Sequence, residues 1–385
     1  MQKTLFVENT AVFLADTDAA SVLSQDGKKV HKPIMSKART GTYTPYSDIT
    51  FKRQSATKQT LEVDTFEYAA EEIDWTDKKQ TAKYNPVTFS AMSMQRNLNN
   101  RIEQNYLSKI TGSKHTIDGA TLGGASGSYV DFQGSAIFDV FEAADTRLGS
   151  ADAPLEGRTA VFGPHAIAAI RKLKSQRETP LGDSVMANGV IGPWNGWTIV
   201  QNNNLPWSAS LKIATQPTDG DTVVIAGVTF TFKTTLGTTA GQVLIGGSAS
   251  AARTNLKSAI EGGGTAGTDY IELDTEDQFI IREKRHVRAT IVSNDMNMTG
   301  YGDIVVSETL TAAADVWSNQ LQGAHFGVRG AIDLVVQIDP NDIRIIEKEK
   351  GFADLTKSLL GMGAKMYDDG ARASVYAKFD ASNWK

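Results

Sequence analysis

Apolar residues recur at every fourth position between residues 90 and 110, and polar residues such as Glu103 occupy the opposite side. A repeat of this period places its members on one face of an α-helix. The pattern therefore predicts a long helix with one buried stripe, ended by Gly112 as a C-terminal cap. The stripe consists of Met94, Leu98, Ile102, Tyr106 and Ile110. A long helix with a single buried face is typical of a helix that lies on a sheet.

Shorter patterns on either side of the middle of the chain mix helices and strands. After residue 129 the apolar positions predict a helix over 137–148, a strand over 158–162 and a helix that begins near Pro164. After residue 323 they predict only strands, over 334–338, 343–346, 355–364 and 373–379. We interpret these two stretches as separate parts of one body that contains both helices and sheets.

Residues 30–84 are expected to be extended, because prolines disfavour helix there and Leu61–Asp64 alternate between apolar and acidic. The pattern predicts a long hairpin whose first limb is basic and whose return limb, residues 62–77, contains no basic residue. The two limbs can balance each other in a solvated sheet, or they can pair with a neighbouring copy of the chain. For pairing between copies, the candidate interface residues are Lys52, Arg53, Lys58, Glu62, Asp64 and Glu67.

The middle module, residues 209–322, differs in composition because it is rich in Gly, Thr and Ala. A turn around Gly220 precedes a predicted hairpin over 222–232, and a helix over 250–260 is followed by three glycines that end it. Further strands are expected at 270–273, 279–283, 287–292 and 304–306. We interpret the middle module as a compact α+β unit inserted into the body, with its entry and exit close together in space.

Composition adds two constraints on this organisation. A chain of 385 residues with 41% apolar residues can bury real cores and divide into two or three domains. Residues 210–322 hold 8 basic and 13 acidic residues and so carry the whole net charge of -5. A neutral body argues against a dedicated DNA-binding domain, and an acidic module is typical of a solvated outer face.

Residues that support catalysis are sparse. The absence of cysteine excludes disulfides, thiolate nucleophiles and cysteine-based zinc sites. The five histidines lack metal-ligand spacing, and no catalytic signature stands in its structural context. We therefore expect no catalytic residue, cofactor or metal site, and we expect that the chain is not an enzyme. No apolar run is long enough to span a membrane, and residues 1–12 make a poor signal peptide, so we expect a cytoplasmic product.

Two clusters allow both a functional and a structural interpretation. The basic run Arg282–Arg288 could bind phosphate or a neighbour's carboxylates, or it could form the solvated face of an edge strand. Trp194, Trp197 and Trp207 could stack on a sugar, or they could form a hydrophobic packing seam. The structural interpretation is the simpler one for both clusters.

Several motifs, taken in order, resemble those of tailed-bacteriophage major capsid (coat) proteins with the Hong Kong 97-type fold. The resemblance is carried by Thr60-Leu61-Glu62-Val63-Asp64, by Val161-Phe162-Gly163-Pro164-His165-Ala166, by the segment from Gly189 to Pro206, and by Gly330–Gln337 with the final hairpin. Each motif is short, and their common order along the chain gives the likeness its specificity.

The resemblance implies an α+β fold and a division of the chain into parts. Residues 1–29 would be an N-terminal arm, 30–84 an extended hairpin (the E-loop) with the start of a peripheral domain, and 85–128 a spine helix with more of that domain. Residues 129–208 would begin an axial domain, and 323–385 would complete the axial and peripheral domains. The middle module, 209–322, would be an inserted surface domain.

The resemblance also implies a function. The chain would be a major capsid protein that self-assembles through hexamers and pentamers into the icosahedral shell of a tailed double-stranded DNA phage. It would be located in the virion, assemble in the host cytoplasm and enclose DNA without a dedicated DNA-binding site or a membrane. Its other implied partners are a portal and a separate scaffolding protein. The alternative is a surface adhesin or glycan-binding structural protein that acts through the inserted domain.

Overall fold

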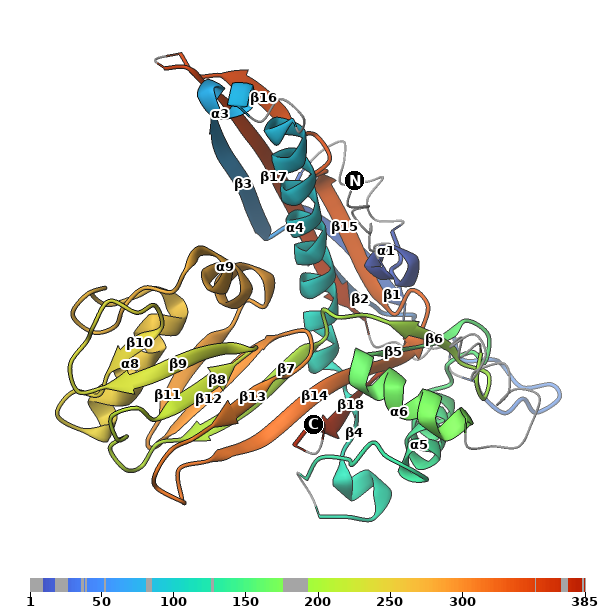
Figure 1. Ribbon diagram of the computed structural model, residues 1–385. Coiled ribbons are helices and arrows are strands. Elements are labelled where there is room, and N and C mark those ends of the chain that lie inside the picture. Colours follow the sequence, from blue (N-terminus) through green and yellow to red (C-terminus); the bar gives the residue numbers. More distant parts are fainter. Residues whose placement is uncertain are drawn as a thin grey trace.

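The computed structural model describes residues 10–17, 27–35, 38, 40–51, 53–80, 85–125, 128–175, 193–349, 351–367, 373–382 and 384. Parts of the expected N-terminal arm, the segment 176–192 and the turn at 368–372 lie outside the described residues. The described residues form an elongated lobe, a central lobe and the middle module beside it (Figure 1). Helices and sheets are mixed throughout, so the predicted α+β class is confirmed.

The elongated lobe is a four-stranded sheet with the long helix α4 (Pro86–Ser108) along one face (Figure 1). Strand β17 (Ala353–Met366) is central, with β3 (Thr65–Asp74) on one side and both β15 (Ile332–Ile338) and β16 (Arg344–Glu347) on the other. Leu360 and Met362 of β17 pack with the apolar stripe of α4, so the predicted long helix is confirmed. It begins at Pro86, where the side chain of Asn85 accepts a hydrogen bond from the N–H of Val87.

Two strands form a separate ribbon at the base of the elongated lobe. Strand β1 (Lys29–Met35) pairs antiparallel with β2 (Ala56–Glu62), so the chain turns back between residues 36 and 55. The acidic residues that follow lie in β3, which pairs with β17. The predicted pairing of a basic limb with an acidic limb is therefore wrong, because the hairpin closes before the acidic segment begins. The end of the segment is also not extended, since helix α3 (Trp75–Gln80) follows β3.

An eight-stranded sheet joins the central lobe to the middle module. Its longest strand, β14 (Trp317–Val328), pairs with β7 (Pro206–Lys212) along its first half and with β18 (Ser374–Asp380) and β5 (Arg158–Phe162) along its second. Strands β4 (His115–Ile117) and β6 (Thr198–Gln201) complete the lobe's part of the sheet. Helices α5 (Ala136–Ser150) and α6 (Pro164–Ser175) pack on this part, over a core rich in phenylalanine. The turns η1 (Lys109–Gly112) and η2 (Gly119–Leu122) connect α4 to the lobe.

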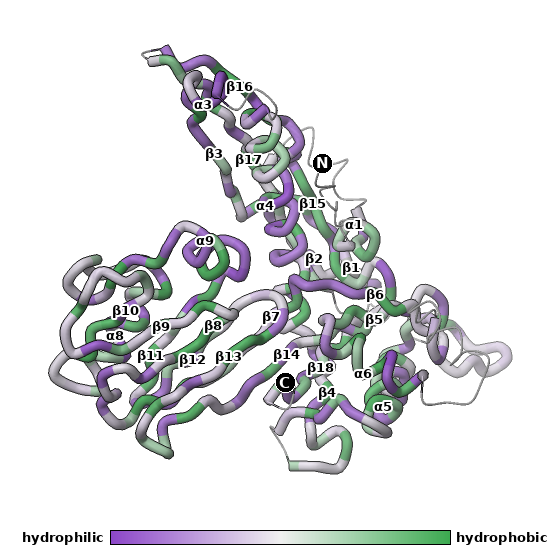
Figure 2. The backbone as a smooth tube through the Cα atoms, in the orientation of Figure 1, coloured by the Kyte–Doolittle hydropathy of each residue, from purple (hydrophilic) through white to green (hydrophobic). Residues whose placement is uncertain are grey.

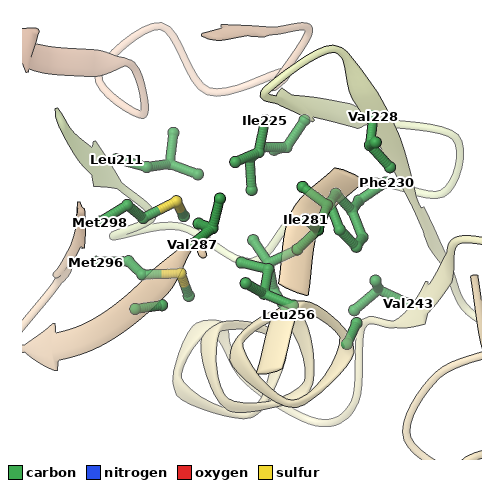
Figure 3. Close-up of a cluster of buried hydrophobic side chains, with 14 of the residues drawn as sticks. Leu211, Ile225, Val228, Phe230, Val243, Leu256, Ile281, Val287, Met296 and Met298 are labelled. Carbon is green, nitrogen blue, oxygen red and sulfur yellow. The ribbon is translucent and has the colours of Figure 1, made fainter. Parts of the chain in front are cut away.

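The middle module has its own core between two sheets and a helix (Figure 3). Strands β11 (Arg288–Val292) and β12 (Asp295–Tyr301) extend the eight-stranded sheet, and α8 (Ala249–Glu261) packs against them. The second sheet has the order β10 (Gln242–Leu244), β9 (Val228–Lys233), β8 (Thr222–Ile225) and β13 (Val306–Glu308). Residues 209 and 322, which bound the module in the sequence, lie inside β7 and β14, so those strands run from the module into the body.

One part of the module differs from its prediction. The strand expected at 279–283 is wrong, because helix α9 (Thr275–Gln278) continues into a π-helical turn, η3 (Phe279–Lys284). Asp274 starts the helix by accepting a hydrogen bond from the N–H of Asp277 at 2.8 Å. Residues 270–273 form no ladder, and only Tyr270 makes isolated bridges. A short apolar run such as Phe279–Ile281 has no period that separates strand from helix.

Candidate assembly surfaces

The histidines occupy separate packing positions. Burial lowers the pKa of His325 to about 4, and its Nε2 lies 2.8 Å from the hydroxyl of Ser374. Burial, together with Arg101 and Arg288, lowers the pKa of His286 to about 4. Both rings are therefore neutral near pH 7. In the described ranges, no group of three or more His, Asp or Glu could hold a metal ion. No described helix is long and apolar enough to cross a membrane.

The basic interface candidates lie on the ribbon and the loop before it. Arg53 and Lys58 are exposed, and Lys58 stands opposite Pro33 in the pairing of β2 with β1. Within the part of the chain that the structure describes, neither side chain lies within 4 Å of a carboxylate. Lys52 lies outside the described residues. Arg53 and Lys58 therefore remain available for a contact with another molecule.

The acidic candidates do not meet the basic ones. Glu62 pairs with Lys29 at 2.9 Å and Lys28 at 3.6 Å, and the hydrogen bond from Lys29 lowers the pKa of Glu62. Glu67 pairs with Arg101 of α4 at 3.0 Å. Asp64 is exposed and accepts a hydrogen bond from the hydroxyl of Thr65. The structure thus uses two of the three acids inside the chain and leaves Asp64 at the surface.

Exposed aromatic and aliphatic residues form two surfaces that the sequence patterns did not predict. The loop surface follows β1 and carries Tyr43, Tyr46, Ile49 and Phe51, of which Phe51 is 93% exposed. The sheet surface lies on the face of the elongated lobe opposite α4 and carries Phe66, Tyr68, Ile346 and Leu359. Phe66 is 50% exposed and Tyr68 is 78% exposed. In β3, exposed Phe66 and Tyr68 alternate with half-buried Thr65 and Glu67, and the sequence shows the alternation without showing which side is exposed.

Glu103 lies on the side of α4 that the helical pattern assigns to polar residues. It is nevertheless buried, with 2% of its surface exposed, and it joins three segments of the chain. Its Oε1 accepts from the N–H of Thr10 at 2.7 Å and from the Thr10 hydroxyl at 3.0 Å. Its Oε2 accepts from the side-chain amides of Asn202 at 3.1 Å and Asn204 at 2.6 Å. The carboxylate therefore joins helix α1 (Thr10–Leu14), α4 and the segment between β6 and β7. The helical pattern alone does not reveal this burial, because the donors come from segments distant in sequence.

The middle module is fixed to α4 close to this junction. The side-chain amide of Gln104 donates to the carbonyl of Lys284 at 2.8 Å, and Arg101 donates to the Oε1 of Gln104 at 3.0 Å. Asn203 accepts from Arg285 at 3.3 Å and from the N–H of Asp303 at 3.2 Å. Residues from α4, from the segment before β7 and from the module thus form one hydrogen-bonded unit.

The basic run 282–288 is not the solvated face of one edge strand, because residues 282–284 are π-helical and the strand β11 begins only at Arg288. Arg282 donates to the carbonyls of Ala259 and Ile260 at the end of α8 and pairs with Glu272 at 2.7 Å. Only Arg288 lies in a strand, at the start of β11. Strand β11 is an edge strand of the eight-stranded sheet, because β12 is its one neighbour among the described strands.

The tryptophans belong to packed cores. Trp197 is fully buried in the central lobe, where its ring meets those of Phe141 and Phe326. Trp207 is buried in the core of the middle module. These two rings are enclosed, so the packing interpretation holds for them. Trp194 is half-buried, and its ring packs on those of Phe138 and Phe141.

No protein-family model and no curated protein matches the chain. Among solved structures, its fold is similar to one from Mycobacterium phage Che8, with 14% identity, a TM-score of 0.52, and coverage of 95% of this chain and 90% of that one. It is also similar to the capsid of Ralstonia phage GP4, with 11% identity, a TM-score of 0.50, and coverage of 96% and 87%. A third likeness is to the head structure of Helicobacter pylori bacteriophage KHP40, with 8% identity, a TM-score of 0.50, and coverage of 98% and 94%.

These similarities extend over nearly the full length of both chains in each comparison. They show that the chain shares its fold with these phage structures. The chain has the Hong Kong 97-type fold of tailed-phage capsid proteins, and the resemblance drawn from its motifs is confirmed at the level of fold.

Proposed function

We propose that the chain is a major capsid protein that self-assembles into the icosahedral shell of a tailed double-stranded DNA phage. The observation that supports this function most directly is the presence of two unlike apolar surfaces on a chain with a capsid fold. Contiguous exposed apolar residues on a soluble protein usually mark an interaction site. Burying an exposed phenylalanine ring stabilises an interface by about 1.5–3 kcal/mol.

A contact between the loop surface of one copy and the sheet surface of the next would be heterologous. Repeated heterologous contacts close into a ring when the rotation between copies permits it, as hexamers and pentamers require. Arg53 and Lys58 flank the loop surface, and Asp64 precedes the sheet surface in the chain. We infer that these charges orient the ring contact, while Glu62 and Glu67 stabilise the subunit itself.

The remaining assignments follow from this role. The shell would enclose DNA by its geometry, and the subunit would work through surfaces rather than by catalysis. Further partners would be a portal and a separate scaffolding protein, with assembly in the host cytoplasm and the finished protein in the virion. The middle module would be a surface domain, carried by the strands β7 and β14 that it shares with the body.

The two apolar surfaces can be tested by paired substitutions in the full chain. Tyr46→Ser with Phe51→Ser alters the loop surface, and Phe66→Ser with Tyr68→Ser alters the sheet surface. Both variants should fold with little change in thermal midpoint, because the replaced rings are exposed. Both should fail to form shells or rings in electron microscopy and sedimentation.

A matched control is Leu155→Ser, which removes an apolar side chain that is 79% exposed and belongs to neither surface. This variant should assemble like the unmodified chain. Normal shells from both double variants would show that neither apolar surface carries the assembly.

A further inference from the structure

Residues 274–288 carry two neighbouring clusters of opposite charge at one end of the middle module. The acidic cluster consists of Glu276 and Asp277, beside the helix-capping Asp274. The basic cluster consists of Lys284 and Arg288, with Arg96 of α4 beside them. Figure 1 shows α9 at the side of the module that faces the elongated lobe, and Figure 2 shows hydrophilic stretches there next to a short hydrophobic one.

The acidic cluster has no counter-charge among the residues that the structure describes. No cation of that part of the chain lies within 4 Å of the carboxylates of Glu276 or Asp277. Partial burial and the neighbouring carboxylates of Asp274 and Glu276 raise the pKa of Asp277. The carboxylates of Asp274, Glu276 and Asp277 thus lie together at the start of α9, where the first two repel the third.

The basic cluster likewise has no acidic counter-charge among the described residues. Partial burial and the nearby cations Arg285 and Arg96 lower the pKa of Lys284. No carboxylate of the described chain lies within 4 Å of Lys284, Arg288 or Arg96. The other two arginines of this stretch are already engaged, Arg282 with the end of α8 and Arg285 with Asn203.

The two clusters are held at a fixed separation. Ile281, which lies between them, is fully buried in the module's core, and the carbonyl of Lys284 is bound by Gln104. Glu276 and Lys284 are eight positions apart along α9 and the π-helical turn η3, a separation on the order of 10 Å. The chain therefore presents a rigid surface whose two ends have opposite charge.

We propose that this surface is a two-fold contact between two copies of the chain, in which the acidic cluster of each copy meets the basic cluster of the other. A surface with both charges on one side is complementary to itself after a two-fold rotation. A head-to-tail contact would instead need the opposite charges on two different sides of the subunit. A nucleic acid at the basic cluster would be repelled by the acidic cluster, which lies on the order of 10 Å away, about one Debye length at 0.1 M salt.

The contact rests on the proposed function for its place in the particle, where it would join subunits beyond the ring formed by the apolar surfaces. In solution it is a separate property, because a pair of full-length chains suffices to form it. The contact should weaken as salt is raised from 0.1 M to 1 M, since screening shortens the Debye length from about 10 Å to about 3 Å.

Charge substitution tests the contact in the full-length chain by sedimentation velocity at low salt. An all-acidic variant carries Lys284→Glu and Arg288→Glu, and an all-basic variant carries Glu276→Lys and Asp277→Lys. Each variant alone should self-associate at least about tenfold more weakly than the unmodified chain, because attraction becomes repulsion. An equimolar mixture of the two variants should recover the association, because each acidic surface then meets a basic one.

The matched control carries Lys233→Glu and Lys257→Glu, which change the module's charge by the same amount outside this segment. It should associate like the unmodified chain. Unchanged association of both test variants, or a mixture that fails to recover it, overturns the proposal. Loss of duplex DNA binding by the all-acidic variant, without recovery in the mixture, would instead assign the basic cluster to a polyanion.

Electron microscopy of the same samples separates this contact from the proposed function. Shells formed equally by the unmodified chain and by both test variants would refute the two-fold contact and leave the capsid function in place. Salt-sensitive pairs that the mixture restores, from a chain that never forms rings or shells, would support the contact and refute the capsid function.

Discussion

Replacing Glu103 by glutamine keeps the shape of a buried side chain and removes its charge. Two donors from Thr10 converge on Oε1, and the amides of Asn202 and Asn204 converge on Oε2. A glutamine amide has a single oxygen, so one pair of donors must then face an NH₂ group. The substitution Glu103→Gln therefore removes two hydrogen bonds to a charged acceptor.

The magnitude follows from this geometry. A hydrogen bond to a charged group contributes about 1.5–3 kcal/mol, so the loss of two would cost roughly 3–6 kcal/mol. The folded protein no longer bears the desolvation cost of a buried carboxylate, which offsets part of that loss. We expect the free energy of unfolding to fall by about 2–4 kcal/mol.

Urea unfolding followed by tryptophan fluorescence measures this change. Hydrogen exchange adds a local readout, because helix α1 should exchange faster once Thr10 loses its acceptor. The matched control is Glu156→Gln, which changes an exposed glutamate outside the junction. A Glu103→Gln variant as stable as the control, with unchanged protection of α1, would refute the assignment of Glu103 as a structural junction.

Two further predictions concern the middle module and pH. Replacing residues 213–315 by Asn-Gly joins Lys212 to Val316 at the point where β7 and β14 pair. The body should stay folded, because the cores of the two lobes contain no residue from that range. A molten product in circular dichroism would contradict this prediction. The pKa of His325 is about 4 in the folded protein and about 6.5 in the unfolded chain. Between these pH values the unfolded chain binds more protons, so the free energy of unfolding should fall by up to about 3 kcal/mol as the pH drops from 6.5 to 4. His325→Gln should reduce this pH dependence in urea titrations, and an unchanged dependence would assign it to other groups.

Sequence patterns predicted the elements that are defined by nearby residues. The stripe from Met94 to Ile110 marks α4, and the turn at Ala226-Gly227, where both residues adopt positive φ, marks the β8–β9 hairpin. Such features depend on a few consecutive residues, so their periodicity and turn chemistry identify them.

Features that depend on distant pairing were not predictable in the same way. Nothing near β3 indicates that its partner is β17, almost three hundred residues later in the chain. Glu103 carries a polar side chain on a helix and becomes buried only because Thr10, Asn202 and Asn204 reach it from other segments. The apolar loop surface likewise has no periodic pattern, and its exposure becomes visible only in the fold. The domain boundaries stay predictions, with β7 and β14 shared between the module and the body.

Electron microscopy of the concentrated full-length chain, expressed alone and together with a scaffolding partner, shows whether the protein forms a shell. We expect uniform closed shells or rings of five and six subunits. A chain that stays small and monodisperse under every one of these conditions would contradict the proposal that it builds a capsid.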